Sequence, residues 1–139
     1  MTSSATVSKQ VSRATILGTT VALGVVGVAL IFAPVEIASA LGVSDTASAA
    51  SVALLLQLYG AALFGLAMTG WMVKDAIVGG IFGRSYVVGN AAHSLVGALV
   101  LIRPALAAGA TPLLIVLTTI YWVLAIAFFY LMFMASPGA

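Results

Sequence analysis

The stretch "SVALLLQLYGAALFGLAMTGWMV", residues 51–73, decides the class of this protein. It contains no acidic or basic side chain, and it ends at the charged pair Lys74–Asp75. A helix that crosses the hydrocarbon core of a bilayer needs about 20 predominantly apolar residues. The stretch therefore predicts a membrane-spanning helix.

The composition of the whole chain also indicates that lipid, and not water, surrounds most of the protein. The 139 residues are 63% hydrophobic and only 6% charged, whereas soluble domains carry about 25% charged residues. Five basic and three acidic residues cannot cover the surface of a soluble domain of this size. We therefore expect an integral membrane protein.

Several classes of function are excluded by what the sequence lacks. A net charge of +2 from so few residues is too small for nucleic-acid binding, which uses clustered lysine and arginine. The absence of cysteine excludes disulfides, thiolate nucleophiles and iron–sulfur ligation. The sequence has a single histidine and no HExxH, GxSxG or Walker motif in a suitable context, so we expect neither a metal site nor a catalytic motif.

Three further segments resemble the first in length and apolar character, at residues 14–33, 86–102 and 112–134. The connections between them are too short for a second domain. The sequence thus predicts one all-α domain over residues 1–139, an integral membrane four-helix bundle. Glycine is frequent in the first three spans, as close helix packing in lipid requires, and absent from the fourth.

The distribution of basic residues predicts the orientation of the bundle. Lys9, Arg13, Lys74 and Arg84 fall on the side shared by both termini and the second connection, whereas Arg103 falls on the other. Because cytoplasmic loops carry an excess of lysine and arginine, we expect both termini in the cytoplasm.

The first connection, "PVEIASALGVSDTAS", predicts a short interfacial helix between the first two spans. Pro34 suits a first helical turn, Glu36 lies near the positive helix end, and Leu41–Gly42 indicates a stop. Ser44 or Asp45 could then cap the second span. The basic start, apolar run and "ASA" also resemble a signal peptide, but the run exceeds the usual 7 to 15 residues or so. We therefore expect the first span to be retained.

Polar side chains within the spans carry the information about function, because they have no reason to enter lipid unless they are used. Helix geometry of about 1.5 Å per residue places them in two layers. The layer in the outer half contains Gln57, His93, Thr118, Thr119 and Trp122. The layer in the inner half contains Thr19, Thr20, Thr69 and Asn90. No carboxylate lies in a span, so ion transport by one protomer is not expected.

His93 is the most informative of these residues. Gly89, His93 and Gly97 are spaced by four and share a helix face, with Asn90 beside them. The simplest interpretation is an interhelical hydrogen bond, for example to Gln57 or a threonine. Alternatively, a cofactor could be bound by five of these residues: His93, Asn90, Gln57, Gly89 and Gly97.

Two kinds of cofactor suit such a site. Neutral imidazole can ligate the metal of a haem or chlorophyll-type pigment, and Gly89-x-x-x-His93 resembles the small-residue-x-x-x-His arrangement of bacterial light-harvesting helices. In those helices the small residue leaves room for the macrocycle. A quinone hydrogen-bonded to His93, Gln57 or Tyr121 is the other candidate.

The second connection, "KDAIVGGIFGR", predicts a turn at the membrane surface. We expect Lys74 and Arg84 to meet lipid phosphates and Asp75 to pair with one of these cations. The apolar, glycine-rich middle could lie at the interface or dip back into the membrane. A catalytic Asp75 would need a partner within hydrogen-bond reach, and the sequence predicts none at its depth.

The block "YGAALFGLAMTGWMVKDAIVGGIFGRSYVVGNAAHSLVGAL" completes a layout that resembles the small DoxX-like four-helix membrane proteins of bacteria. The resemblance covers roughly residues 10 to 134. It implies a bacterial inner-membrane location and an accessory role, and it supplies no catalytic residues.

Three hypotheses follow. The first is a structural or accessory subunit that packs in a homo-oligomer or a larger membrane complex. The second is a tetrapyrrole- or quinone-binding protein that uses His93. The third is a membrane enzyme or transporter for an apolar substrate.

Overall fold

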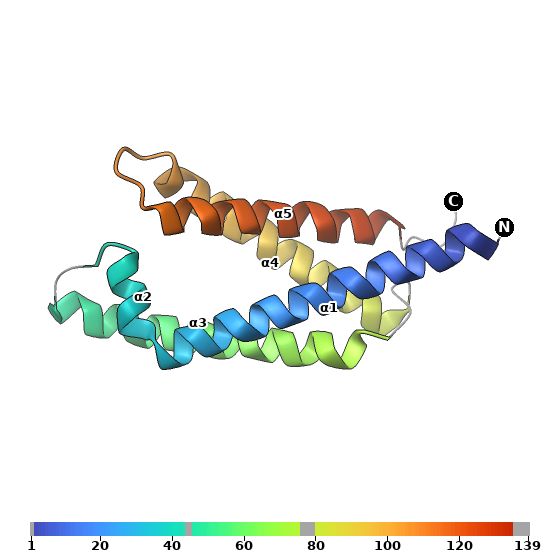
Figure 1. Cartoon of the computed structure of the whole chain (residues 1–139), viewed down its shortest axis with the longest axis horizontal. Helices are drawn as coiled ribbons and strands as arrows, with labels where there is room; N and C mark the ends of the chain where they lie inside the picture. Colours follow the sequence, from blue (N-terminus) through green and yellow to red (C-terminus); the bar gives the residue numbers. More distant parts are fainter. Residues whose placement is uncertain (1, 44–45, 76–79, 135–139) are drawn as a thin grey trace.

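The computed structural model describes residues 2–43, 46–75 and 80–134. Five helices follow one another along the chain: α1 (Thr2–Phe32), α2 (Pro34–Ala40), α3 (Thr46–Val73), α4 (Ile81–Ala105) and α5 (Pro112–Met134). The described residues contain no strand, which confirms the predicted all-α class. The start of α1, the end of α3, the start of α4 and the end of α5 lie at one end of the molecule, opposite α2 and the α4–α5 loop (Figure 1).

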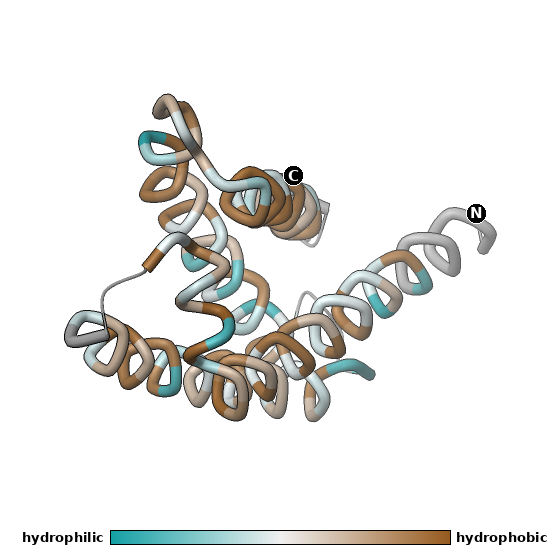
Figure 2. The backbone as a smooth tube through the Cα atoms, turned by 60° about the vertical axis from the view of Figure 1, so that its left-hand side comes forward, coloured by the Kyte–Doolittle hydropathy of each residue, from teal (hydrophilic) through white to brown (hydrophobic). Residues whose placement is uncertain are grey.

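Four of these helices are long and apolar enough to cross a membrane. Their candidate spans are Gln10–Phe32, Ser48–Val73, Ile81–Ala105 and Pro112–Phe133. Figure 2 shows hydrophobic residues throughout the four long helices, interrupted by few hydrophilic ones. Helices α1, α3 and α4 extend beyond the predicted spans because backbone hydrogen bonding continues into the less apolar flanking residues. The length and composition of these helices are those of a multi-pass membrane protein.

The predicted short helix after the first span is present as α2. Pro34 occupies its first turn, where the missing N–H costs nothing. Gly42 has φ +94°, and its N–H donates to the Ser39 carbonyl (2.9 Å). The Val43 N–H donates to the Ala38 carbonyl (3.1 Å). This pair of bonds is a Schellman motif, for which glycine is the favoured residue. The predicted caps Ser44 and Asp45 lie outside the described residues.

The long helices form two antiparallel hairpins. Helix α1 packs along α3, and α4 packs along α5. In the first hairpin, Gly27 and Gly60 allow the backbones to approach: a Cβ atom on Gly27 would lie 2.8 Å from the Gly60 carbonyl oxygen. Leu23 and Leu30 of α1 pack nearby against Leu63 of α3. The small residues thus serve the close packing that the sequence predicted.

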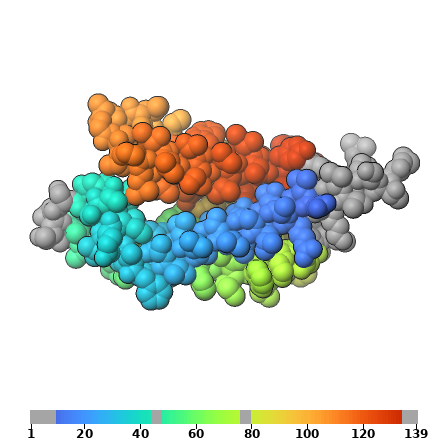
Figure 3. Space-filling model, in the orientation of Figure 1, coloured from blue at the N-terminus to red at the C-terminus, as the bar shows by residue number. Residues whose placement is uncertain are grey.

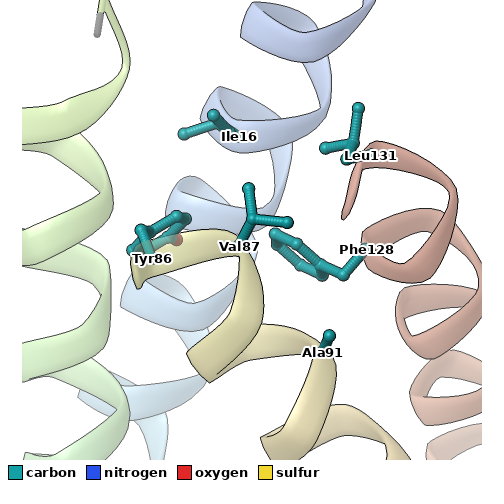
Figure 4. Packing of buried hydrophobic residues seen from close by; sticks show 6 residues of the cluster. All are labelled: Ile16, Tyr86, Val87, Ala91, Phe128 and Leu131. Atoms are coloured by element: carbon teal, nitrogen blue, oxygen red, sulfur yellow. The ribbon is translucent and has the colours of Figure 1, made fainter. Parts of the chain in front are cut away.

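The two hairpins contact each other over far fewer residues. One contact is a buried cluster near the end where α1 begins and α5 ends, at which Ile16 of α1 meets residues of α4 and α5 (Figure 4). The other residues of this cluster are Tyr86, Val87, Ala91, Phe128 and Leu131. Toward the opposite end, the surface is hollowed between α5 and the α1–α2 segment (Figure 3). The hairpins are therefore joined at one end and splayed at the other.

Candidate functional site

Midway along the bundle, three helices bring polar side chains together. Tyr59 of α3 and Tyr121 of α5 hydrogen-bond through their hydroxyl groups. His93 Nε2 of α4 lies 3.4 Å from the Tyr59 Oη atom and 3.4 Å from the Tyr121 Oη atom. The imidazole ring also stacks against the Tyr59 ring, with centroids 6.2 Å apart and planes 29° apart. We call these three residues the Tyr–His–Tyr cluster.

Gly97 positions this cluster. A Cβ atom on Gly97 would overlap the ring of Tyr121, so only glycine admits the ring at this point of α4. The Tyr121 ring consequently lies beside His93, one helical turn away, with ring centroids 5.6 Å apart. Gly89, on the preceding turn, is exposed, and nothing lies within 4 Å of where its Cβ atom would stand. The two glycines that flank His93 therefore differ: Gly97 packs against the Tyr121 ring, whereas Gly89 has no neighbouring side chain.

The cluster borders an open cleft between α3 and α4. Its volume is about 430 Å³, and its walls are Tyr59, Ala92, His93, Val96, Gly97 and Val100. Ala92, Val96 and Val100 are exposed on α4, so the cleft opens at the side of the helix pair. It therefore combines apolar walls with a phenol and an imidazole.

The other two predicted site residues lie apart from the cluster. The Gln57 amide donates to the Ile31 carbonyl at the end of α1 (3.1 Å). The Asn90 amide donates to the Tyr86 carbonyl one turn earlier in α4 (3.0 Å), and its side chain is buried. Each amide thus hydrogen-bonds a backbone oxygen, and neither is shown in contact with His93.

The predicted outer layer does not form one network. The hydroxyls of Thr118 and Thr119 donate to carbonyls four residues earlier in α5, at 2.8 and 2.9 Å. Such bonds satisfy a threonine within its own helix. Of the two tyrosines, Tyr121 was predicted only as a possible quinone partner, and Tyr59 was not assigned to the site. Their long side chains reach across helices, and spacing along one helix does not reveal such contacts.

Near the predicted inner layer, two buried hydroxyls make no well-formed hydrogen bond among the described residues, although Thr20 and Asn90 are the polar neighbours of the Tyr86 hydroxyl. These are Thr20 Oγ1 of α1 and the Tyr86 hydroxyl of α4. Both lie against Gly70 of α3, where a Cβ atom would overlap them. Gly70 therefore provides the space in which α1 and α4 bring these groups to α3.

The charged residues near the α3–α4 connection form an ion-pair group outside the cluster. Asp75 pairs with Arg13 of α1 (Nε–Oδ1, 3.0 Å) and with Lys74 (Nζ–Oδ2, 3.6 Å). The pairing with Lys74 was one of the two predicted, whereas Arg13 takes the place expected for Arg84. The Lys74 ammonium lies 4.4 Å from the centre of the Trp71 ring and donates to the Trp71 carbonyl (3.1 Å). Residues 76–79, the centre of the predicted surface turn, lie outside the described residues.

The geometry of His93 bears on the two cofactor hypotheses. Axial ligation of a haem or chlorophyll-type pigment requires a ring nitrogen directed at the metal, and Nε2 instead faces two phenol oxygens. Both tyrosines would have to move before Nε2 could become a ligand. Hydrogen bonding to an oxygen of a ligand requires no such change. The residues present therefore fit a hydrogen-bonded ligand better than a tetrapyrrole.

Comparisons of this chain with protein-family models, with curated proteins and with solved structures find no match.

Proposed function

We propose that this protein is a small accessory subunit of a bacterial inner membrane, with both termini in the cytoplasm, that acts by packing its helices against another copy or a larger complex. The observation that carries this proposal is the placement of glycines that the fold itself does not use. Gly18 and Gly65 are exposed, and nothing lies within 4 Å of where their Cβ atoms would stand.

Each of these glycines is centred in a row of small residues on one helix face. On α3 the row is Ala61, Gly65 and Thr69, all exposed. The Thr69 hydroxyl donates to the Gly65 carbonyl (3.0 Å), so the row presents little polar character. On α1, Ala14 and Ala22 flank Gly18 in the same i±4 pattern and are exposed as well. Residues four apart lie on the same helix face.

Small rows of this kind suit helix association in lipid. Between spanning helices, association depends on close van der Waals packing, which small residues allow. A glycine in a helix costs about 1 kcal/mol relative to alanine. At a position that faces only lipid, no packing interaction offsets this cost. Inside the molecule, Gly27 and Gly60 serve close approach between α1 and α3. We infer the same use for Gly65, with a helix of a partner.

The proposal is tested by the mass of the assembly in lipid nanodiscs or mild detergent. We expect the wild type to exceed the 14.0 kDa chain mass, as an oligomer or with a copurifying protein. Gly65→Leu should release the monomer, because the larger side chain fills the row. Val123→Leu is the control: it enlarges an exposed residue on α5, away from the row, and should leave the mass unchanged. A wild type that is a lone monomer in lipid would contradict the proposal.

A further inference from the structure

We propose that the cleft between α3 and α4 binds an apolar, membrane-soluble molecule whose carbonyl or other acceptor oxygen receives a hydrogen bond from His93. The inference is independent of the packing role proposed above. It rests on how the Tyr–His–Tyr cluster distributes its protons and on the cleft that the cluster borders.

The two phenols have two protons to place. Tyr59 and Tyr121 bond through their hydroxyls, so one phenol donates to the other. The accepting phenol still has its own proton, and the acceptor within reach is His93 Nε2, 3.4 Å from both oxygens. Were Nε2 protonated, that phenol would be left without an acceptor among apolar side chains and lipid tails, which is costly. Nε2 is therefore the acceptor.

A neutral imidazole with an unprotonated Nε2 carries its proton on Nδ1. Among the described residues, no acceptor hydrogen-bonds to Nδ1 of His93, since both of its contacts involve Nε2. The cluster thus has one donor left over. His93 is at the middle of α4, about 18 Å from either helix end at 1.5 Å per residue, where lipid tails offer no acceptor.

The cleft supplies the place for that acceptor. His93 and Tyr59 form its polar wall, and Ala92, Val96 and Val100 form its apolar wall. Its volume of about 430 Å³ falls within the roughly 300–1,000 Å³ typical of small-molecule sites. Because its apolar wall residues are exposed on a spanning helix, a ligand would enter sideways from the hydrocarbon. An apolar molecule with an acceptor oxygen matches both walls.

The test uses a tritiated benzophenone, a diaryl ketone that cross-links to nearby C–H bonds on irradiation, with the full chain in lipid vesicles. Labelled peptides should contain Tyr59 and the segment 92–100. Fluorenone, which has a ketone, should compete about two- to tenfold better than fluorene, its hydrocarbon analogue, as expected for one hydrogen bond. Equal competition by the two compounds would overturn the proposal.

Substitutions at Val96 and His93 distinguish the contribution of the cleft to ligand binding from that of the hydrogen bond. Val96→Trp fills the cleft from an exposed position and should abolish labelling, whereas Leu99→Trp, exposed on α4 but outside the cleft, should not. His93→Phe should retain labelling but lose the preference for fluorenone. Unchanged labelling in Val96→Trp would contradict the assignment, because that variant disturbs no buried packing.

The natural ligand can be sought in protein purified from native membranes. Mass spectrometry of an organic extract would distinguish a quinone from another ketone-bearing lipid, and either supplies the acceptor oxygen. A tetrapyrrole absorption band that disappears in His93→Phe would overturn the proposal, because it would make His93 a metal ligand.

Discussion

Gly27 and Gly60 face each other where α1 crosses α3, and a Cβ atom on either would collide with the carbonyl oxygen of the other. Gly60→Ala should therefore destabilise the fold by about 1–3 kcal/mol, the usual cost of overpacking. Unfolding in mixed SDS micelles, followed by circular dichroism, measures this. Gly89→Ala is the control, because it lies outside the proposed packing rows and nothing lies within 4 Å of its added methyl group. Equal effects of both substitutions would show that the crossing is not close.

The hydroxyl of Tyr59 should contribute measurably to stability. Tyr59→Phe removes the bond to Tyr121 and the contact with His93, and intramembrane side-chain bonds contribute about 0.6–1.7 kcal/mol. Tyr130→Phe offers the comparison, because Tyr130 is 56% exposed on α5. The same SDS titration should show a loss for Tyr59→Phe and none for Tyr130→Phe; identical midpoints would argue against the cluster.

Removal of the hydroxyl should affect stability differently at Tyr86 and Thr20. Their buried hydroxyls make no well-formed hydrogen bond among the described residues, and the Tyr86 hydroxyl has only Thr20 and Asn90 as polar neighbours, so little hydrogen-bond energy offsets the cost of burying them. Tyr86→Phe and Thr20→Val should therefore leave stability unchanged or raise it. A clear loss of stability in Tyr86→Phe would mean that its hydroxyl is hydrogen-bonded in the folded protein.

The ion pair between Arg13 and Asp75 should matter little to stability. Both side chains are about 60% exposed (61% and 59%), and exposed pairs contribute about 0–1 kcal/mol. A double-mutant cycle with Arg13→Ala and Asp75→Ala should give a coupling within that range, decreasing as salt is added. A coupling well above this range, unaffected by salt, would require a buried pair.

Much of the fold could be predicted from the sequence. The apolar segments indicated the four long helices, because the bilayer sets the length of a spanning helix. Local chemistry also indicated the short helix that starts at Pro34 and stops at Gly42, since proline and glycine act through their own backbone. The positions of the helix ends were harder to predict, because backbone hydrogen bonding continues past the last apolar residue.

The candidate site could be predicted only in part. His93 and Gly97 were recognised from their spacing on one helix, and the structure places both beside Tyr121. Gln57 and Asn90 were expected nearby, but their amides bond the backbone. The contribution of Tyr59 depends on the rotation of α3 relative to α4 and α5. That rotation is set by packing between helices, such as the ring of Tyr121 against Gly97.

We propose that four helices cross a membrane and that both termini lie in the cytoplasm. Labelling with a membrane-impermeant maleimide tests it most directly, because the chain contains no cysteine and each introduced thiol is therefore unique. In intact cells, Glu36→Cys and Ala108→Cys should react, whereas Ser4→Cys and Asp75→Cys should react only after the membrane is permeabilised. Reaction of Ser4→Cys and Asp75→Cys on opposite sides of the membrane would contradict the account.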